Sequence, residues 1–559
     1  MLLPSWPQWR ELPKILSNHE KKLIIFFSVL IIISTVDLGY SFYVARTEFK
    51  PMPSGHYIEG ALGQPKFINP IINETFLDRD LSSLIFSSLF KYNSDGKLVA
   101  DLVEKFEIKN NGKEYWLTLR RDIIWHNQDK FNADDVIFTI ETIKNSDYQS
   151  NLRPIFTGVT AEKKDDYLIV FLLDNSNYLF LNNLIFGIIP RILENIDPRS
   201  FALSEFNLKP IGTGPYQFDN FEKDKSGRIR TFTIKRFEKY YNPKPNLDYL
   251  TFNFYNNYDE LKTVLESGEI NGVARLENSD IEKFTFKDTT PYRFKIPKYF
   301  AIFFNQQNNL ILGDKKFRMA INKAINKAEL VKKTLNNEGE IMNFAIPNFI
   351  LNKTSFNEFN LGESKKIFDQ FGFKENSAGY LKLSKNTKED SSIITLTILD
   401  NPEMRGLAEL IKEQLKVVKI NIKIIALPLN DFLVEIKSRR YQALLIPETL
   451  NLLPDLSSFW SSHFKNYPGL NLSLYTNRQV DKLLESIKTE ANQEIRVKKY
   501  QQFADLIAID MPAIFLYSPY YNFVVSDKIK GIKVNIANSS QDRFSNIFDW
   551  YTEVERVWK

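Results

Sequence analysis

The longest apolar run in the chain lies near its N-terminus. From Leu23 to Ala45 the residues are mostly Ile, Leu, Phe and Val, and Asp37 is the one charged residue among them. A helix of this length crosses a hydrocarbon core of about 30 Å. Asp37 lies past the middle, so its penalty falls below the roughly 2.5–3.5 kcal/mol of a carboxylate at the bilayer centre. The aromatic residues near the end are typical of a membrane interface, and the pattern predicts a transmembrane helix over 23–45.

The charges around this run predict its orientation. Arg10, Lys14, Lys21 and Lys22 precede it, which favours a cytoplasmic N-terminus over residues 1–22 and an extracytoplasmic main body. A cleaved signal peptide and a buried soluble helix are the alternatives. The long segment before the run, and the lack of a small-x-small motif after it, favour an uncleaved single-pass anchor in the cell membrane. Residues 46–55, with two prolines, then form a linker.

Beyond the linker, strand and helix patterns alternate along the chain. Hydrophobic residues recur at every second position in three segments, which predicts strands: Tyr115, Leu117 and Leu119; Ile394, Leu396 and Ile398; and Ile420, Ile422 and Ile424. Helical spacing recurs in two others: Phe317, Ala320, Ile321, Ala324 and Ile325; and Leu407, Leu410, Ile411, Leu415 and Val418. The mixture predicts an α/β protein.

One short segment, 131–136, combines an ordinary structural motif with residues that catalysis also uses. Asn132 is a good N-cap and Asp135 stands at the capping-box position, while Phe131 and Val136 can form a hydrophobic staple. The neighbouring carboxylates of Asp134 and Asp135 could instead serve acid–base chemistry. Both acids stabilise the positive end of a helix, so we interpret the segment as a helix start.

Composition narrows the possible functions. The 559 residues carry a net charge of +5, too little over this length to predict a nucleic-acid partner, and they include no cysteine. Disulfides, thiolate metal sites, cysteine nucleophiles and a lipidated cysteine are therefore excluded. His56 and His463 have no metal-spaced partners, and His19 falls in the cytoplasmic segment. We interpret His126, in a predicted turn after Trp125, as structural. We predict no catalytic residue, no metal and no cofactor, and hence no enzyme.

Several sequence motifs follow one another in a fixed order along the part of the chain after the apolar run. They are 57–70 with its Ile-Asn-Pro ending, 84–143, the Pro-Ile-Gly-Thr-Gly-Pro-Tyr phrase at 210–216, and the segments 316–325, 469–484 and 511–517. Together they resemble the solute-binding proteins of peptide and nickel ABC importers, known as family 5. The resemblance covers about residues 56–535. At 125–128 the chain reads Trp-His-Asn-Gln where that family usually has Trp-His-Asp-Gly.

The resemblance implies a periplasmic-binding-protein-like fold with two lobes and an extra subdomain. Lobe I would comprise 56–95, 205–300 and 518–559, the accessory subdomain 96–204, and lobe II 301–517. By this resemblance, a peptide-like or other small solute would stabilise a closed state by bridging the lobes. An ABC permease and its ATPase would be the partners, and the protein would perform no chemistry.

Positions carried over from the resemblance give candidate ligand contacts. They are Glu59, Gly60 and Ala61 on the first strand, Pro447, Glu448, Thr449 and Asn451 after a strand over 441–446, and Tyr517 on the returning strand. Main-chain pairing with an extended peptide gives affinity that tolerates many sequences. Two alternatives stay open, because Glu59 could lie on a solvated strand edge and Tyr517 could be an ordinary strand aromatic.

One departure concerns the ligand. Peptide-binding members of the family carry an aspartate that pairs with the free amine of the ligand, and here that position falls on Asn451 or Leu452. A buried ammonium without a counter-charge is costly. We therefore expect Glu448 or Glu59 to supply the charge, or the ligand to lack a free amine. A non-transport sensor or surface scaffold of the same fold is the alternative function, and an exported hydrolase is a third.

Overall fold

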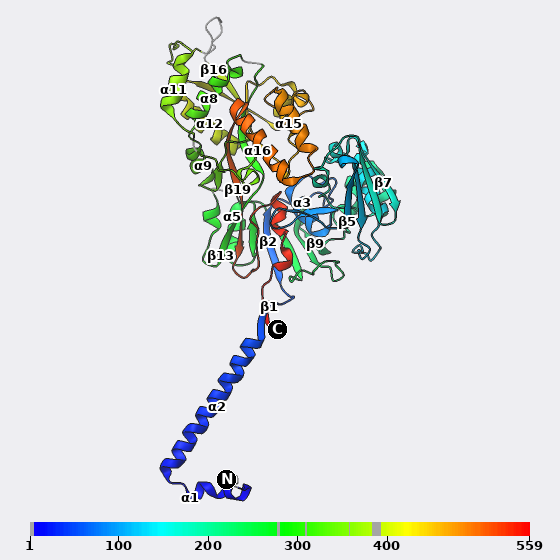
Figure 1. The fold of residues 1–559 in the computed structure, drawn as a ribbon, viewed down its shortest axis with the longest axis vertical. Helices are drawn as coiled ribbons and strands as arrows, with labels where there is room; N and C mark the ends of the chain where they lie inside the picture. Colours follow the sequence, from blue (N-terminus) through cyan, green and yellow to red (C-terminus); the bar gives the residue numbers. More distant parts are fainter. Residues whose placement is uncertain (1–4, 277–279, 308–309, 357, 383–392) are drawn as a thin grey trace.

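The computed structural model describes residues 5–276, 280–307, 310–356, 358–382 and 393–559. A large body stands at the end of one long helix (Figure 1). That helix, α2 (Asn18–Arg46), has no buried residue, and Ser17 and Glu20 form a capping box at its start. It follows the short helix α1 (Trp6–Ile15). By length and composition α2 is one helix that could cross a membrane, as the apolar run predicts.

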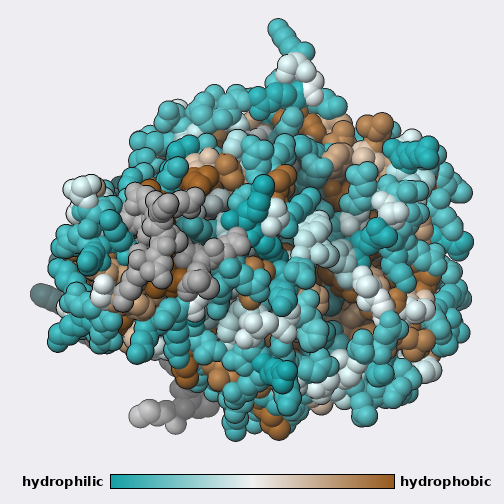
Figure 2. Space-filling model, turned by 90° about the horizontal axis from the view of Figure 1, so that it is seen from above, coloured by the Kyte–Doolittle hydropathy of each residue, from teal (hydrophilic) through white to brown (hydrophobic). Residues whose placement is uncertain are grey.

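Seen from the end opposite α2, the body is mainly hydrophilic (Figure 2). Hydrophobic residues gather there in patches and recesses, as on an ordinary water-facing protein surface. In α2, by contrast, bulky apolar side chains such as Ile25, Ile31 and Val36 are more than 60% exposed. The body and the long helix are therefore suited to different surroundings.

A twelve-stranded sheet runs through the body. Ten strands form its main path, and their order with bounds is β17 (Asn421–Leu427), β16 (Ile393–Leu399), β18 (Ala443–Thr449), β14 (Lys298–Phe304), β19 (Ala513–Ser526), β12 (Gly272–Ala274), β2 (His56–Leu62), β11 (Tyr249–Tyr255), β10 (Ile229–Arg236) and β9 (Tyr216–Lys223). Two further strands, β13 (Thr289–Lys295) and β15 (Gly339–Ile341), pair with β19.

The long strand β19 joins the two lobes. Its first residues pair with β14 and β15, and its last residues pair with β12 and β13. The predicted lobe limits at 300/301 and 517/518 thus fall inside β14 and β19 rather than in loops. The α/β class with two lobes is confirmed, and the lobes share backbone hydrogen bonds along one strand.

Lobe II has a helical layer on each face of its sheet. Phe300, Ile302 and Phe304 of β14 point into one hydrophobic cluster, while Tyr299 and Phe303 point into the other. The first cluster contains α8 (Lys315–Ala324), α9 (Lys327–Leu335) and α12 (Pro402–Lys416), and the second contains α13 (Leu429–Ser438), α15 (Arg478–Lys488) and α16 (Gln493–Asp510). The two segments whose hydrophobic residues have helical spacing are confirmed as helices α8 and α12.

The accessory part is built on a four-stranded antiparallel sheet. Its order is β5 (Val103–Lys109), β6 (Glu114–Leu119), β8 (Leu168–Leu173) and β7 (Val159–Asp165), and α4 (Ala133–Lys144) packs on β7. Asn132 caps α4, and the Asp135 carboxylate accepts from Asn132 N (3.1 Å) and Trp125 Nε1 (3.2 Å). The interpretation of Asp135 as a helix cap is confirmed.

The glycine-rich phrase at 210–216 holds α3 (Phe76–Ile85) to the accessory part. A Cβ at Gly214 would lie 2.6 Å from the Ile85 carbonyl oxygen, so only glycine fits there. His126 Nδ1 accepts from Gly212 N (3.1 Å), and its Nε2 lies 3.1 Å from the Gly214 carbonyl. Burial lowers the pKa of His126 to about 4, which keeps the ring neutral. Both ring nitrogens serve the fold, in agreement with a structural role.

Candidate ligand-binding groove

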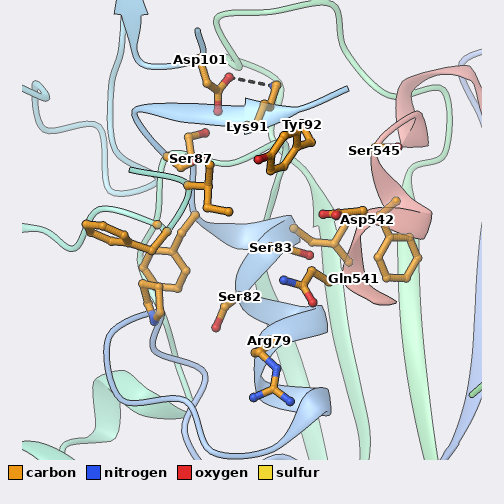
Figure 3. A pocket seen from close by; sticks show the side chains of 18 of the residues that line it. Arg79, Ser82, Ser83, Ser87, Lys91, Tyr92, Asp101, Gln541, Asp542 and Ser545 are labelled. Carbon is orange, nitrogen blue, oxygen red and sulfur yellow. Dashed lines mark hydrogen bonds and ion pairs between the residues drawn. The ribbon is translucent and has the colours of Figure 1, made fainter. Parts of the chain in front are cut away.

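A cavity of about 300 Å³ opens in lobe I between α3, β3 (Phe90–Tyr92) and the 3₁₀ turn Ser540–Phe544 (Figure 3). Its lining contains both polar and apolar side chains. The polar lining includes Arg79, Ser82, Ser83, Ser87, Lys91, Tyr92, Asp101, Gln541, Asp542 and Ser545. Apolar side chains such as Phe186 and Phe548 complete the wall, so the cavity combines apolar surface with convergent polar groups, as ligand sites do.

A second cavity, of about 250 Å³, lies between the accessory part and lobe II. The segment that follows β18 forms one wall and the segment that follows β8 forms the other. The residues on these walls include Asn177, Leu179, Asn182, Asn183, Thr449, Leu450, Asn451 and Asp455. Amide side chains from two parts of the protein therefore face the same space.

Hydrogen bonds join the walls of the two cavities, although no described residue lines both. Tyr92 lines the first, and its hydroxyl donates to Asn182 Oδ1 of the second (2.9 Å). Asn538 lines the first, accepts from Leu452 N (2.9 Å) and lies within a long hydrogen bond of Asn451 (3.5 Å). We call the two cavities together the junction groove, because lobe I, the accessory part and lobe II all contribute to it.

Charges of both signs line the groove. Lys91 and Asp101 form an ion pair at 2.8 Å; burial opposes the charge on Lys91, but Asp101 outweighs it and raises the pKa of Lys91. Asp542 Oδ2 accepts from the backbone of Asn538 (2.8 Å) and Ser539 (2.9 Å). Burial nevertheless raises the pKa of Asp542 to about 6. The groove thus offers a carboxylate that changes charge near neutral pH.

The predicted residues of lobe II lie at or next to this groove. The predicted strand over 441–446 is β18 (Ala443–Thr449), so Pro447, Glu448 and Thr449 lie within the strand and not after it. Thr449 and Asn451 line the groove. Glu448 is buried on the neighbouring position, accepts from the Tyr299 hydroxyl (3.2 Å), and has its pKa raised by burial to about 8. Pro447 is half-buried opposite Phe300 in the sheet. That Glu448 contacts the ligand stays a prediction.

The remaining predicted residues lie deeper in the fold. Gly60 packs where a Cβ would meet Leu261 and Ile270, and Ala61 lines a separate cavity of about 60 Å³. Tyr517 is fully buried in the lobe II core against Phe300, at 4.9 Å between ring centres. The structure therefore does not bring Gly60, Ala61 and Tyr517 into the junction groove, and their contact with a ligand stays a prediction.

Glu59 belongs to a buried ionic cluster. Arg543 Nη2 lies 2.6 Å from Glu59 Oε1 and 2.9 Å from Asp80 Oδ2, and all three side chains are at most 1% exposed. The Tyr57 hydroxyl donates to the second oxygen of Glu59 (2.9 Å). Since Arg543 already neutralises part of the charge of Glu59, this carboxylate is poorly placed to receive a ligand amine.

Sequence reasoning missed Tyr92, Asn182 and Asp542. Their only local pattern is at Asp542, which completes a Ser-x-x-Asp capping box with Ser539. That pattern predicts a helical turn but says nothing about a cavity. All three come to the groove from segments far apart in the chain, so spacing along the sequence could not reveal them.

Comparisons with known proteins agree with this architecture. Residues 97–471 match the family described as bacterial extracellular solute-binding proteins, family 5. The chain is 26% identical to the oligopeptide-binding protein AppA of Bacillus subtilis, over 87% of this chain and 90% of that one. It is 23% identical to the dipeptide-binding protein of Escherichia coli, over 85% and 91%.

Two solved structures show the same fold. One is AppA of Bacillus subtilis in complex with a nonapeptide, with a TM-score of 0.69 and 24% identity, covering 90% of this chain and 100% of the other. The other is NikZ of Campylobacter jejuni in complex with Ni(L-His), with the same TM-score, identity and coverage. The ligands in these two structures differ in chemistry, so the likeness shows the fold and leaves the ligand of this chain open.

Proposed function

The chain belongs to family 5 of the bacterial extracellular solute-binding proteins, and from that membership we propose a receptor that binds a small solute and delivers it to an ABC importer. The solute is bound between the lobes and released unchanged. Ligand that contacts both lobes favours the closed state by its differential affinity for it. The permease and ATPase of the importer are the partners, and no cofactor takes part.

The observation that carries this proposal is the junction groove. Three parts of the protein line it, and a ligand that occupied both of its cavities would touch lobe I at Asp542 and lobe II at Thr449 and Asn451. The strand β19 pairs with β12 at one end and with β14 at the other, so one strand connects the two lobes. This arrangement supports binding coupled to a lobe movement.

We propose a peptide-like ligand with a cationic group at Asp542. The relatives named above bind oligopeptides and dipeptides, and a peptide carries both an amine and amide groups. Asn177, Asn183 and Asn451 offer amide donors and acceptors that suit its main chain. Peptide-binding relatives have an aspartate for the ligand amine at the position that is Asn451 or Leu452 here. We propose that Asp542 supplies this negative charge instead.

We also propose that α2 is an uncleaved anchor, with residues 1–22 in the cytoplasm and the body outside. The helix is continuous from Asn18 to Arg46 and leads directly into β1 (Thr47–Pro51). A helix with no buried residue and exposed Ile, Leu and Phe side chains suits lipid and not water. The positive residues before it support this orientation.

Native mass spectrometry of the full chain tests the proposed function. The protein is purified in detergent and sprayed with and without prior denaturation. We expect a small solute to co-purify and to be recovered with an unchanged mass after denaturation. The receptor proposal fails if neither a purified solute nor any member of an added di- to nonapeptide mixture binds, or if bound peptides are recovered as cleavage products.

A further inference from the structure

The two ends of the exported chain meet at the top of α2. Strand β1 pairs antiparallel with the C-terminal strand β20 (Val554–Trp558), from Thr47 opposite Trp558 to Pro51 opposite Val554. Lys559 N donates to the Arg46 carbonyl (2.9 Å), so pairing reaches the last turn of the helix. Figure 1 shows this ribbon between α2 and the body. The predicted linker 46–55 therefore contains a strand that pairs with the C-terminal strand, and this two-stranded ribbon connects α2 to the body.

The ribbon has one apolar face. Residues paired across the strands share a face, and alternate residues along each strand do too. Phe49, Val554 and Trp558 lie on one face, 63%, 46% and 63% exposed. The opposite face carries an ion pair of Glu48 with Lys50 (3.0 Å). The ribbon is thus amphipathic, and these three apolar side chains stay largely exposed in the described chain.

An arginine lies among the aromatic rings of this face. The Arg556 guanidinium is 4.5 Å from the ring centre of Phe49 and 5.4 Å from that of Tyr43. Tyr43, in the last turns of α2, also meets Trp558 edge-on at 5.7 Å. No carboxylate of the described residues lies within ion-pair distance of Arg556, which donates a hydrogen bond to Thr47 Oγ1 (3.3 Å). A guanidinium among aromatic rings is well suited to a phosphate.

The position of the ribbon determines what can cover it. A bilayer of about 40–45 Å with a core of about 30 Å leaves roughly 5–8 Å of headgroup region on each side. Strands rise about 3.3 Å per residue, so the first two or three pairs of the ribbon fit within that depth. A two-stranded ribbon is also marginal in water on its own.

We propose that these residues, Tyr43, Phe49, Val554, Arg556 and Trp558, form a collar that sits in the headgroup layer of the outer leaflet. The aromatic side chains lie at the boundary with the acyl chains, and Arg556 binds phospholipid phosphate. This inference rests on the proposed anchor. The collar would hold the body in one orientation relative to the membrane, with lobe I nearest the bilayer and lobe II farthest from it (Figure 1).

Spin labelling tests the collar, because the chain has no native cysteine. Full-length Trp558→Cys, Leu203→Cys and Ser28→Cys variants are labelled with a nitroxide in vesicles of phosphatidylethanolamine and phosphatidylglycerol. Leu203 is 86% exposed on the body, and Ser28 lies in the span. We expect the label at 558 to be more accessible to oxygen than to a water-soluble nickel chelate, and the label at 203 to show the reverse.

The three labels separate the two proposals. In one outcome the chelate does not reach the label at 28 but reaches the labels at 558 and 203 equally well. The collar is then wrong, and the anchor is supported. If the label at 28 is also aqueous, or residue 28 has been removed by cleavage, the anchor itself is wrong. Shielding of 558 from both reagents would indicate protein contact and would overturn the collar. A Phe49→Cys label, across the ribbon, should repeat the result at 558.

Discussion

Replacement of Arg543 by methionine is expected to lower the free energy of unfolding by about 3–5 kcal/mol, the typical cost of breaking a buried ion pair from one side. Methionine replaces the aliphatic stem of arginine but has no guanidinium, so it leaves Glu59 and Asp80 facing each other without a cation. The cluster also ties the C-terminal segment to β2 and α3, so the loss should appear in global unfolding. Urea denaturation followed by tryptophan fluorescence measures it.

The matched control removes the charges as well. The triple variant Glu59→Gln, Asp80→Asn, Arg543→Met should regain most of the lost stability, since no unpaired charge then stays buried. Burial already raises the pKa of Glu59, and the single variant should therefore suffer less at acidic pH, where this carboxyl becomes neutral. A single variant as stable as the native chain at pH 7 would show that the cluster is not what holds the C-terminal segment in place.

Replacement of Asp542 by asparagine is expected to weaken binding of a free-amine peptide roughly 10- to 100-fold, the range of a charge-assisted hydrogen bond of about 1.5–3 kcal/mol. The pKa of Asp542 is about 6, so its carboxylate ionises as pH rises from 5 to 7. The ionised form attracts the ammonium, and affinity should increase with pH over this range and then level off. In Asp542→Asn the increase should be absent.

Isothermal titration of the full chain between pH 5 and 8 measures this effect. Peptides with a free and with an acetylated N-terminus are compared, and the acetylated one should show neither the pH dependence nor the loss. Glu448→Gln is the control variant, because Glu448 is bonded to Tyr299 and has its own pKa near 8. If Glu448→Gln abolishes binding while Asp542→Asn leaves it unchanged, the amine lies in lobe II and our placement of it is wrong.

Much of the fold could be predicted from local patterns. The apolar run predicted α2, and the alternation of hydrophobic and polar residues predicted β6, β16 and β17. The N-cap at Asn132 predicted the start of α4. These features depend on residues within a few positions of one another, where hydrophobic period and capping chemistry act directly. The family motifs, in their fixed order, predicted the two-lobed architecture, and the two solved structures confirm that fold.

The site was less predictable because its contacts are distant in sequence. Glu59 finds its partner Arg543 at a separation of 484 residues, and Tyr92 bonds to Asn182 90 residues away. No local pattern encodes such pairs. Two predicted contacts do line the groove: Thr449 is the last residue of β18, and Asn451 follows two residues later, where the chain leaves the sheet. Asp542 was hidden because its local sequence also satisfies a helix cap.

A receptor that closes on its ligand must change the distance between its lobes. Two exposed sites, Ser226 between β9 and β10 in lobe I and Lys365 in α11 (Leu361–Gln370) of lobe II, can carry nitroxides through a double cysteine variant of the full chain. Double electron–electron resonance then gives their distance distribution before and after a binding peptide is added. We predict a broad distribution that becomes shorter and narrower with ligand, and that returns when the unaltered ligand is washed out. An identical distribution with ligand bound would contradict the clamp, as would recovery of the peptide in cleaved form.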